Sequence, residues 1–185
     1  MKPIAALVLV LASFAMQASP AKEMDPPDSV YQLEARLTDQ AGRARGFDLY
    51  RGSPVLVTMF YGSCPATCPL IIDTLRAIER ELPVENRGRL RVLMISIDPA
   101  RDTPDALREL AATRRIDVTR WTLASADESS VREIAALLDV QYRRLPNGDF
   151  NHSTVITLLS PDGRIAARSS ELGHADPVLV DRLRD

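Results

Sequence analysis

The chain is organised around one stretch, Tyr61-Gly62-Ser63-Cys64-Pro65-Ala66-Thr67-Cys68-Pro69. The apolar run that leads into it, residues 55–61, is typical of a strand that is covered on both faces. After it, residues 71–82 carry apolar side chains at the spacing of one helix face. Both cysteines of the protein therefore lie where a buried strand leads into a helix.

The prolines in this stretch restrict the backbone around the two cysteines. Pro69 suits the first position of a helix, where its missing N–H is not needed. A proline also disfavours the helical conformation in the residue before it, which affects Cys64 and Cys68. We therefore expect Cys68 to be the N-cap residue of the helix, with Cys64 in a loop above it. The helix N-terminus would then stabilise a thiolate on Cys68 and lower its pKa.

Three uses of this cysteine pair stay open from the residues alone. A structural disulfide would close so short a loop that it would add little stability. The thiols could instead cycle between dithiol and disulfide, or they could bind a soft metal ion. His152 begins a predicted strand over 151–159 and could add a nitrogen ligand, although a histidine there more commonly bonds to the backbone. Two thiolates favour Cu(I), an imidazole also allows Cu(II), and zinc would require a fourth ligand.

The remaining pattern predicts a three-layer α/β/α sandwich with a mixed sheet and an N-terminal β-hairpin. The cysteine pair after a central strand makes the arrangement thioredoxin-like by analogy. Helices are expected at 104–115, where Thr103 is the N-cap, at 131–138 after a capping box over 125–128, and from Pro177 onward. Strands are expected at 31–37, 43–49, 55–61, 90–97, 121–123, 151–159 and 164–167.

The loop over 98–104 holds two carboxylates. Asp98 and Asp102 could act together on a hard metal ion or in hydrolysis. The local sequence favours a structural role, in which Asp102 and Thr103 cap the next helix and Asp98 forms a turn. Arg101, between the two, is expected to form an ion pair locally.

Composition and the first residues limit where the protein works. With 185 residues, we expect a signal peptide over 1–21, a linker over 22–30 and one domain over 31–185. The apolar run 4–15 is short for a membrane span, so cleavage is favoured over an uncleaved tether. A net charge of -2 and 5% aromatic residues argue against nucleic-acid binding. The mature chain is expected in the periplasm, where cysteine pairs can be oxidised, as a monomer without a stable membrane span.

Four separated motifs resemble the SCO/SenC family of thioredoxin-like copper proteins. They are residues 60–70, 96–104, 121–123 and 151–154. The resemblance implies that Cys64, Cys68 and His152 bind one copper ion, Cu(I) or Cu(II), and that Asp98 supports the site. Much of the family has Asp where this chain has Ala66, so a carboxylate that could tune the site is lacking.

The resemblance also implies a function, for which two versions compete. In the first, the protein is a metallochaperone and not primarily an enzyme. It delivers copper to the dinuclear copper centre of cytochrome c oxidase, or to another periplasmic copper protein. In the second, it is a thiol–disulfide reductase that keeps the cysteines of a copper protein reduced. That role requires Cys64 and Cys68 as a redox pair but does not require His152.

Overall fold

The computed structural model describes residues 25–64 and 67–184. The predicted signal peptide and Ala66 lie outside these residues. A seven-stranded sheet in the order β2-β1-β5-β4-β3-β8-β9 forms the centre of the molecule. Its strands are β1 (Leu37–Asp39), β2 (Ala44–Arg45), β3 (Val55–Phe60), β4 (Arg91–Ser96), β5 (Trp121–Ala126), β8 (Ile156–Leu159) and β9 (Ile165–Ser169). β3, β4 and β5 are parallel, whereas β8 pairs with β3 antiparallel.

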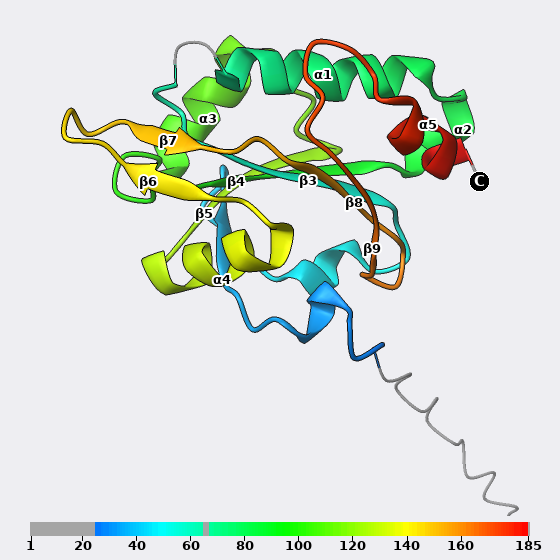
Figure 1. The fold of residues 1–185 in the computed structure, drawn as a ribbon, viewed down its shortest axis with the longest axis horizontal. Helices are drawn as coiled ribbons and strands as arrows, with labels where there is room; N and C mark the ends of the chain where they lie inside the picture. The colour runs from blue at the N-terminus through cyan, green and yellow to red at the C-terminus, as the bar shows by residue number, and fades with distance from the viewer. Residues whose placement is uncertain (1–24, 65–66, 185) are drawn as a thin grey trace, which may run out of the picture.

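Helices cover both faces of this sheet, as Figure 1 shows. They are α1 (Thr67–Glu81), α2 (Val84–Arg89), α3 (Pro104–Thr113), α4 (Glu128–Leu138) and α5 (Pro177–Arg184). α1 lies above the sheet and α4 below it. The thioredoxin-like α/β/α sandwich predicted from the sequence is therefore confirmed. Among the described residues, no helix is long and apolar enough to cross a membrane.

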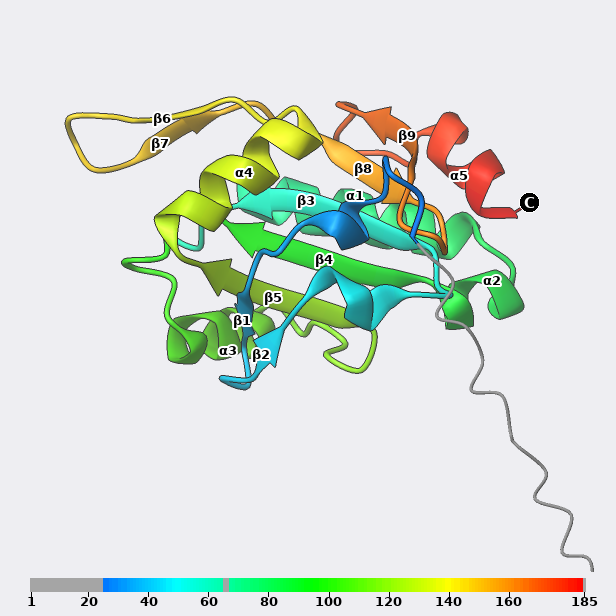
Figure 2. The same cartoon turned by 90° about the horizontal axis from the view of Figure 1, so that it is seen from below.

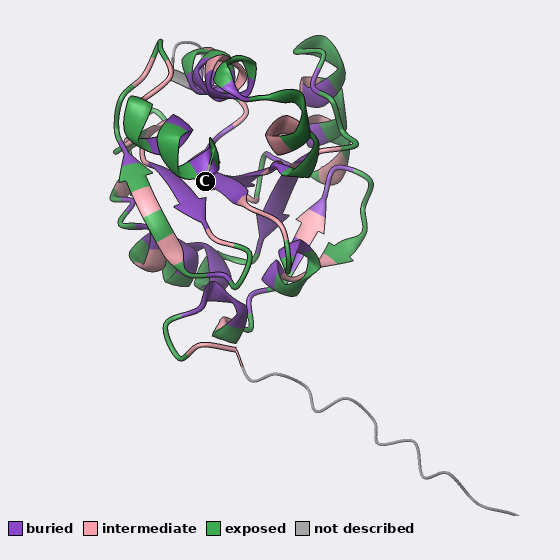
Figure 3. Cartoon of the chain, turned by 90° about the vertical axis from the view of Figure 1, so that its right-hand side faces the viewer, coloured by how far each residue is buried: buried purple, intermediate pink, exposed green. Residues whose placement is uncertain are grey.

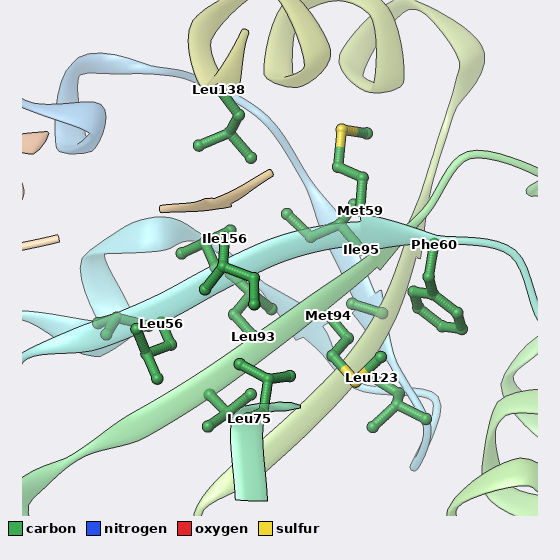
Figure 4. Packing of buried hydrophobic residues seen from close by; sticks show 14 of the residues in the cluster. Leu56, Met59, Phe60, Leu75, Leu93, Met94, Ile95, Leu123, Leu138 and Ile156 are labelled. Atoms are coloured by element: carbon green, nitrogen blue, oxygen red, sulfur yellow. The ribbon is translucent and has the colours of Figure 1, made fainter. Parts of the chain in front are cut away.

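The core lies on both faces of β3 and β4. All six residues of β3 are buried, as the apolar run predicted. Alternate residues of a strand point to opposite sides of the sheet, so both faces carry apolar side chains. Figure 4 shows Leu75 of α1 on one face of the sheet and Leu138 of α4 on the other. Figure 3 shows the buried residues concentrated in the central strands. The N-terminal end of the domain packs against the rest of the fold. Val30 is buried, and its N–H donates to Gly163 O at 2.9 Å.

Several predicted elements were wrong in extent. Residues 30–32 form a 3₁₀ helix in place of a strand, and the hairpin is limited to β1 and β2, with a second 3₁₀ helix at Phe47–Tyr50. α2, a helix over Val84–Arg89, was not predicted from the sequence. β5 extends to Ala126, so Ser125 belongs to the strand and the predicted capping box does not form. Asp127 caps α4 instead, and its side chain accepts hydrogen bonds from Ser129 N and Ser130 N. Thr103 caps α3 as predicted.

The predicted strand over 151–159 is two strands in different sheets. Its first part, β7 (Phe150–His152), pairs with β6 (Tyr142–Arg144), which the sequence analysis missed, and its second part is β8. Figures 1 and 2 show the β6–β7 hairpin projecting beyond the main sheet, at the end to which β3, β4 and β5 point. The carboxyl ends of the parallel strands, where α/β folds usually bind ligands, therefore lie beside this hairpin.

Candidate metal centre

The two cysteines lie at the carboxyl end of β3. Cys64 is four residues past the strand, and Cys68 is the second residue of α1. Both are buried, and no disulfide joins them. The prediction that Cys68 is the N-cap residue was wrong, because α1 begins at Thr67. Pro69 is still within the first turn, where a proline removes no helical hydrogen bond.

Burial determines the protonation of Cys68. The thiol is 2% exposed and donates to the backbone oxygen of Tyr61 at 2.9 Å. Loss of solvent raises its pKa well above the ordinary value, and the neighbouring Cys64 side chain raises it further. The lowered pKa expected from the helix N-terminus was therefore wrong, because desolvation outweighs the helix dipole at this depth. The effect on the pKa means that the Cys64 and Cys68 side chains lie next to each other.

A buried carboxylate fixes the loop before Cys64. Asp102 accepts from Gly62 N at 2.9 Å and from the hydroxyl of Ser96 at the end of β4. Gly62 is required here, because a Cβ at this position would lie 2.6 Å from Asp102 Oδ1. Asp102 therefore does not share the capping of α3 with Thr103, as we had expected. It ties the cysteine loop to β4, and burial raises the pKa of its carboxyl group.

Asp98 has a different place and a different partner. It is buried and forms the expected ion pair with Arg101. Arg101 Nη2 also donates to Gly148 O at 2.6 Å, in the turn of the β6–β7 hairpin. The Asp98–Arg101 pair therefore contacts the hairpin that carries His152. Asp98 also borders a pocket of about 200 Å³ between this loop, α4 and the hairpin, which Tyr142 and Phe150 help to line.

His152 ends β7 and is half-buried. Its Nδ1 lies 3.0 Å from Ser153 O. Because a carbonyl oxygen can only accept, Nδ1 carries the proton in the neutral ring and the lone pair is on Nε2. Burial lowers the pKa of His152, so the ring is neutral at pH 7. A neutral imidazole whose second nitrogen is held by a carbonyl is the form in which histidine binds metal ions.

Tyr61 contacts both His152 and the cysteine pair. Its ring meets that of His152 edge-on, with 5.7 Å between centroids. Its hydroxyl donates to Phe150 O at 3.3 Å, and a hydrogen bond joins its side chain to that of Cys64. Within residues 25–64 and 67–184, no three His, Cys, Asp or Glu side chains are grouped closely enough to hold a metal ion. The fold thus brings the two thiols together and places His152 against the ring of Tyr61, a residue that also contacts Cys68.

The sequence analysis missed the roles of Tyr61, Ser96 and Asp102. Each follows from the parallel register, which places Phe60 opposite Ser96 and so aligns the ends of β3 and β4. A usable signal was present, since the polar Ser96 ends a buried strand directly beside the predicted cysteine loop. For Tyr61, the signal was only its place at the end of an apolar run.

Comparison with known proteins identifies relatives of the chain. The SCO1/SenC family model matches residues 25–183. The SCO1 protein homolog of Bacillus subtilis is 24% identical over 73% of this chain and 72% of its own length. The structure of Bradyrhizobium japonicum ScoI with copper bound superposes with a TM-score of 0.68 at 24% identity, covering 80% of this chain and 94% of that one.

A further relative is also known from a solved structure. It is BsSco, described as containing a disulfide switch and as a member of the Sco family of cytochrome c oxidase assembly proteins. It superposes with a TM-score of 0.67 at 20% identity, covering 86% of this chain and 94% of that one. At these identities, the two solved structures establish a shared fold.

Proposed function

The chain belongs to the SCO1/SenC family, and from that premise we propose that it is a periplasmic copper metallochaperone. It binds one copper ion through Cys64, Cys68 and His152. It passes the ion to the dinuclear copper centre of cytochrome c oxidase, or to another periplasmic copper protein. Relatives support this proposal, because one has been solved with copper bound and another is described as a cytochrome c oxidase assembly protein.

One observation carries the proposal: two buried thiols in contact lie beside a histidine whose Nε2 has an available lone pair. Thiolates suit Cu(I), and two of them can hold it without a third ligand. Adding the imidazole gives a sulfur and nitrogen set that also suits Cu(II). His152 must approach the thiols for this, because among the described residues the three side chains are not grouped closely enough to hold a metal ion, and the ring of Tyr61 packs against His152.

Capture and release follow from this ligand set. Copper binding replaces the thiol protons, which leave to solvent, and forms two copper–sulfur bonds. Three ligands leave the ion open to a further donor, so a thiolate of the acceptor can bind before a chaperone ligand leaves. The cysteines of the chaperone regain their protons as the ion departs.

An anaerobic copper titration of the reduced mature protein, followed by ultraviolet–visible spectra, tests the proposal. We expect a one-to-one endpoint and Cu(II)–thiolate charge-transfer bands. Cys64→Ser and Cys68→Ser should abolish tight binding, and His152→Ala should weaken Cu(II) more than Cu(I). His174→Ala is the matched control, because that side chain is 61% exposed beside Glu171. Equally tight Cu(II) binding without His152 would exclude the three-ligand site.

A thiol–disulfide reductase is the second candidate, favoured by the contact between the two thiols. Here Cys64 and Cys68 would be oxidised to a disulfide while a disulfide in the target protein is reduced, so two electrons and two protons pass to the target. Reduction of a periplasmic copper protein by this chain, unaffected by His152→Ala and without copper uptake, would favour this role over the first.

The cellular location is part of the proposal and has its own test. The apolar run over residues 4–15 and the small residues Ala18 and Ala21 support export and cleavage. Mass spectrometry of the protein recovered from the periplasm should give the mass of a chain that has lost about the first 21 residues, as signal-peptide lengths suggest. A full-length chain found with the membrane fraction would show an uncleaved tether instead.

A further inference from the structure

Tyr61 contacts every part of the proposed copper site through a different group. Its backbone oxygen accepts from the Cys68 thiol at 2.9 Å. Its hydroxyl bonds to Phe150 O on β7 at 3.3 Å, and its side chain also bonds to that of Cys64. Its ring packs edge-on against His152. Tyr61 is therefore the direct connection between the cysteine loop and the hairpin that carries His152.

The geometry of β7 places two of these contacts on one face. Phe150 and His152 are two residues apart on the strand, so their side chains point to the same side. The ring of Tyr61 lies against both, with centroid distances of 5.6 Å to Phe150 and 5.7 Å to His152. Tyr61 is only 5% exposed, so its side chain is enclosed where it meets this face.

We infer that Tyr61 is a positioning residue that separates the His152 ring from Cys64 and Cys68, and that it must turn aside before His152 can become the third copper ligand. The inference rests on the proposed function. It makes the site operate in two stages. The two thiols, already in contact, take Cu(I) without moving Tyr61. Completing the set for Cu(II) requires Tyr61 to leave its hydrogen bonds with Phe150 O and Cys64.

The hydroxyl of Tyr61 offers a conservative way to test this. Tyr61→Phe keeps the ring but removes the hydrogen bonds that hold it in place. One hydrogen bond of this kind changes an equilibrium by roughly 3- to 10-fold. We expect Tyr61→Phe to speed formation of the Cu(II)–thiolate charge-transfer band by about that factor in stopped-flow mixing, while Cu(I) affinity measured by competition with a chromophoric chelator stays unchanged.

Tyr142→Phe is the matched control. Tyr142 is in the same hairpin and also packs against Phe150, at 6.3 Å between ring centroids. It should bind both copper ions at the rate of the unmodified protein. If Tyr61→Phe forms the Cu(II) band no faster than the control, the inference is overturned while the copper site itself stands.

A measurement on the apo protein separates this inference from the proposed function. The Tyr61 ring should shift the NMR signals of the His152 ring protons, and Tyr61→Leu should return them toward ordinary values. Unchanged His152 signals in Tyr61→Leu would overturn the placement of Tyr61, whether or not copper binds. Changed His152 signals in a protein that takes up no copper would instead refute the proposed function, and with it the role of Tyr61 in copper entry.

Discussion

The two halves of the proposed site are built very differently. The cysteine loop continues a strand from the centre of the sheet and is tied to β4 by Asp102, which bonds to Gly62 and Ser96. The β6–β7 hairpin, which carries His152, forms a separate two-stranded sheet. Isolated hairpins are marginally stable in water, so this one depends on contacts such as those of Tyr61 and Arg101. The comparison indicates a preformed thiol pair and a histidine whose position can be adjusted.

The strongest test of this difference between the two halves is to remove a thiol from the preformed thiol pair. Cys68→Ser should lower Cu(I) affinity by more than about 100-fold, beyond the range for substitutions outside the ligand set. Chelator competition under anaerobic conditions measures this. Cu(I) affinity that survives in Cys68→Ser would show that the thiol pair is not the primary site.

Asp102 tests whether the cysteine loop is held as firmly as its contacts suggest. Asp102→Ala leaves the N–H of Gly62 and the hydroxyl of Ser96 without this acceptor. An unsatisfied buried donor costs roughly 1–3 kcal/mol, so we expect the free energy of unfolding to fall by about 2–4 kcal/mol. Urea denaturation of the apo protein measures the change.

Asp105→Ala is the control for Asp102→Ala. Asp105 lies in the first turn of α3, and its side chain is 85% exposed beside Arg108. Surface ion pairs contribute little, so its loss should change stability by less than about 1 kcal/mol. Equal effects of the two substitutions would mean that Asp102 does not anchor the loop.

The pH dependence of copper binding distinguishes the two halves by the pH range over which protons compete with copper. Because burial raises the pKa of Cys68, its thiol stays protonated through neutral pH and must release a proton to bind copper. Cu(I) affinity should therefore rise with pH, by about tenfold per pH unit for this proton alone. His152 has a lowered pKa, so proton competition at the imidazole should begin only below its ordinary titration range. If the Cu(I) affinity did not change between about pH 6 and pH 8, the conclusion that the Cys68 thiol is protonated at neutral pH would be contradicted.

The smallest expected effect concerns the β6–β7 hairpin, which carries His152. Arg101→Ala removes the bond to Gly148 O and the ion pair with Asp98, and so loosens the hairpin. Cu(II) affinity should fall by about 3- to 10-fold, the value of one hydrogen bond, while Cu(I) affinity is unchanged. Arg143→Ala on the exposed side of β6 is the control. A parallel loss of Cu(I) affinity in Arg101→Ala would show that the two halves are not independent.

Much of the main sheet could be predicted because its signals are local. The apolar runs of β3 and β4, the helical spacing in α1 and the Thr103–Pro104 start of α3 all depend on neighbouring residues. Predictions failed where tertiary contacts override local pattern. Residues 151–159 show an uninterrupted strand pattern, yet they are divided between two sheets. His152 ends β7 in the hairpin, and Ile156 begins β8 in the main sheet.

The sequence by itself determined the chemistry: two cysteines between a buried strand and a helix, in a chain that resembles one copper-binding family. Only the tertiary structure decided which residues surround the two cysteines. The antiparallel pairing of Thr58 with Ile156 brings the chain before β8 to the end of β3, and the hairpin then places His152 against Tyr61. Such contacts join residues about 90 positions apart, and no local pattern encodes them because strand register depends on the packing of the whole sheet.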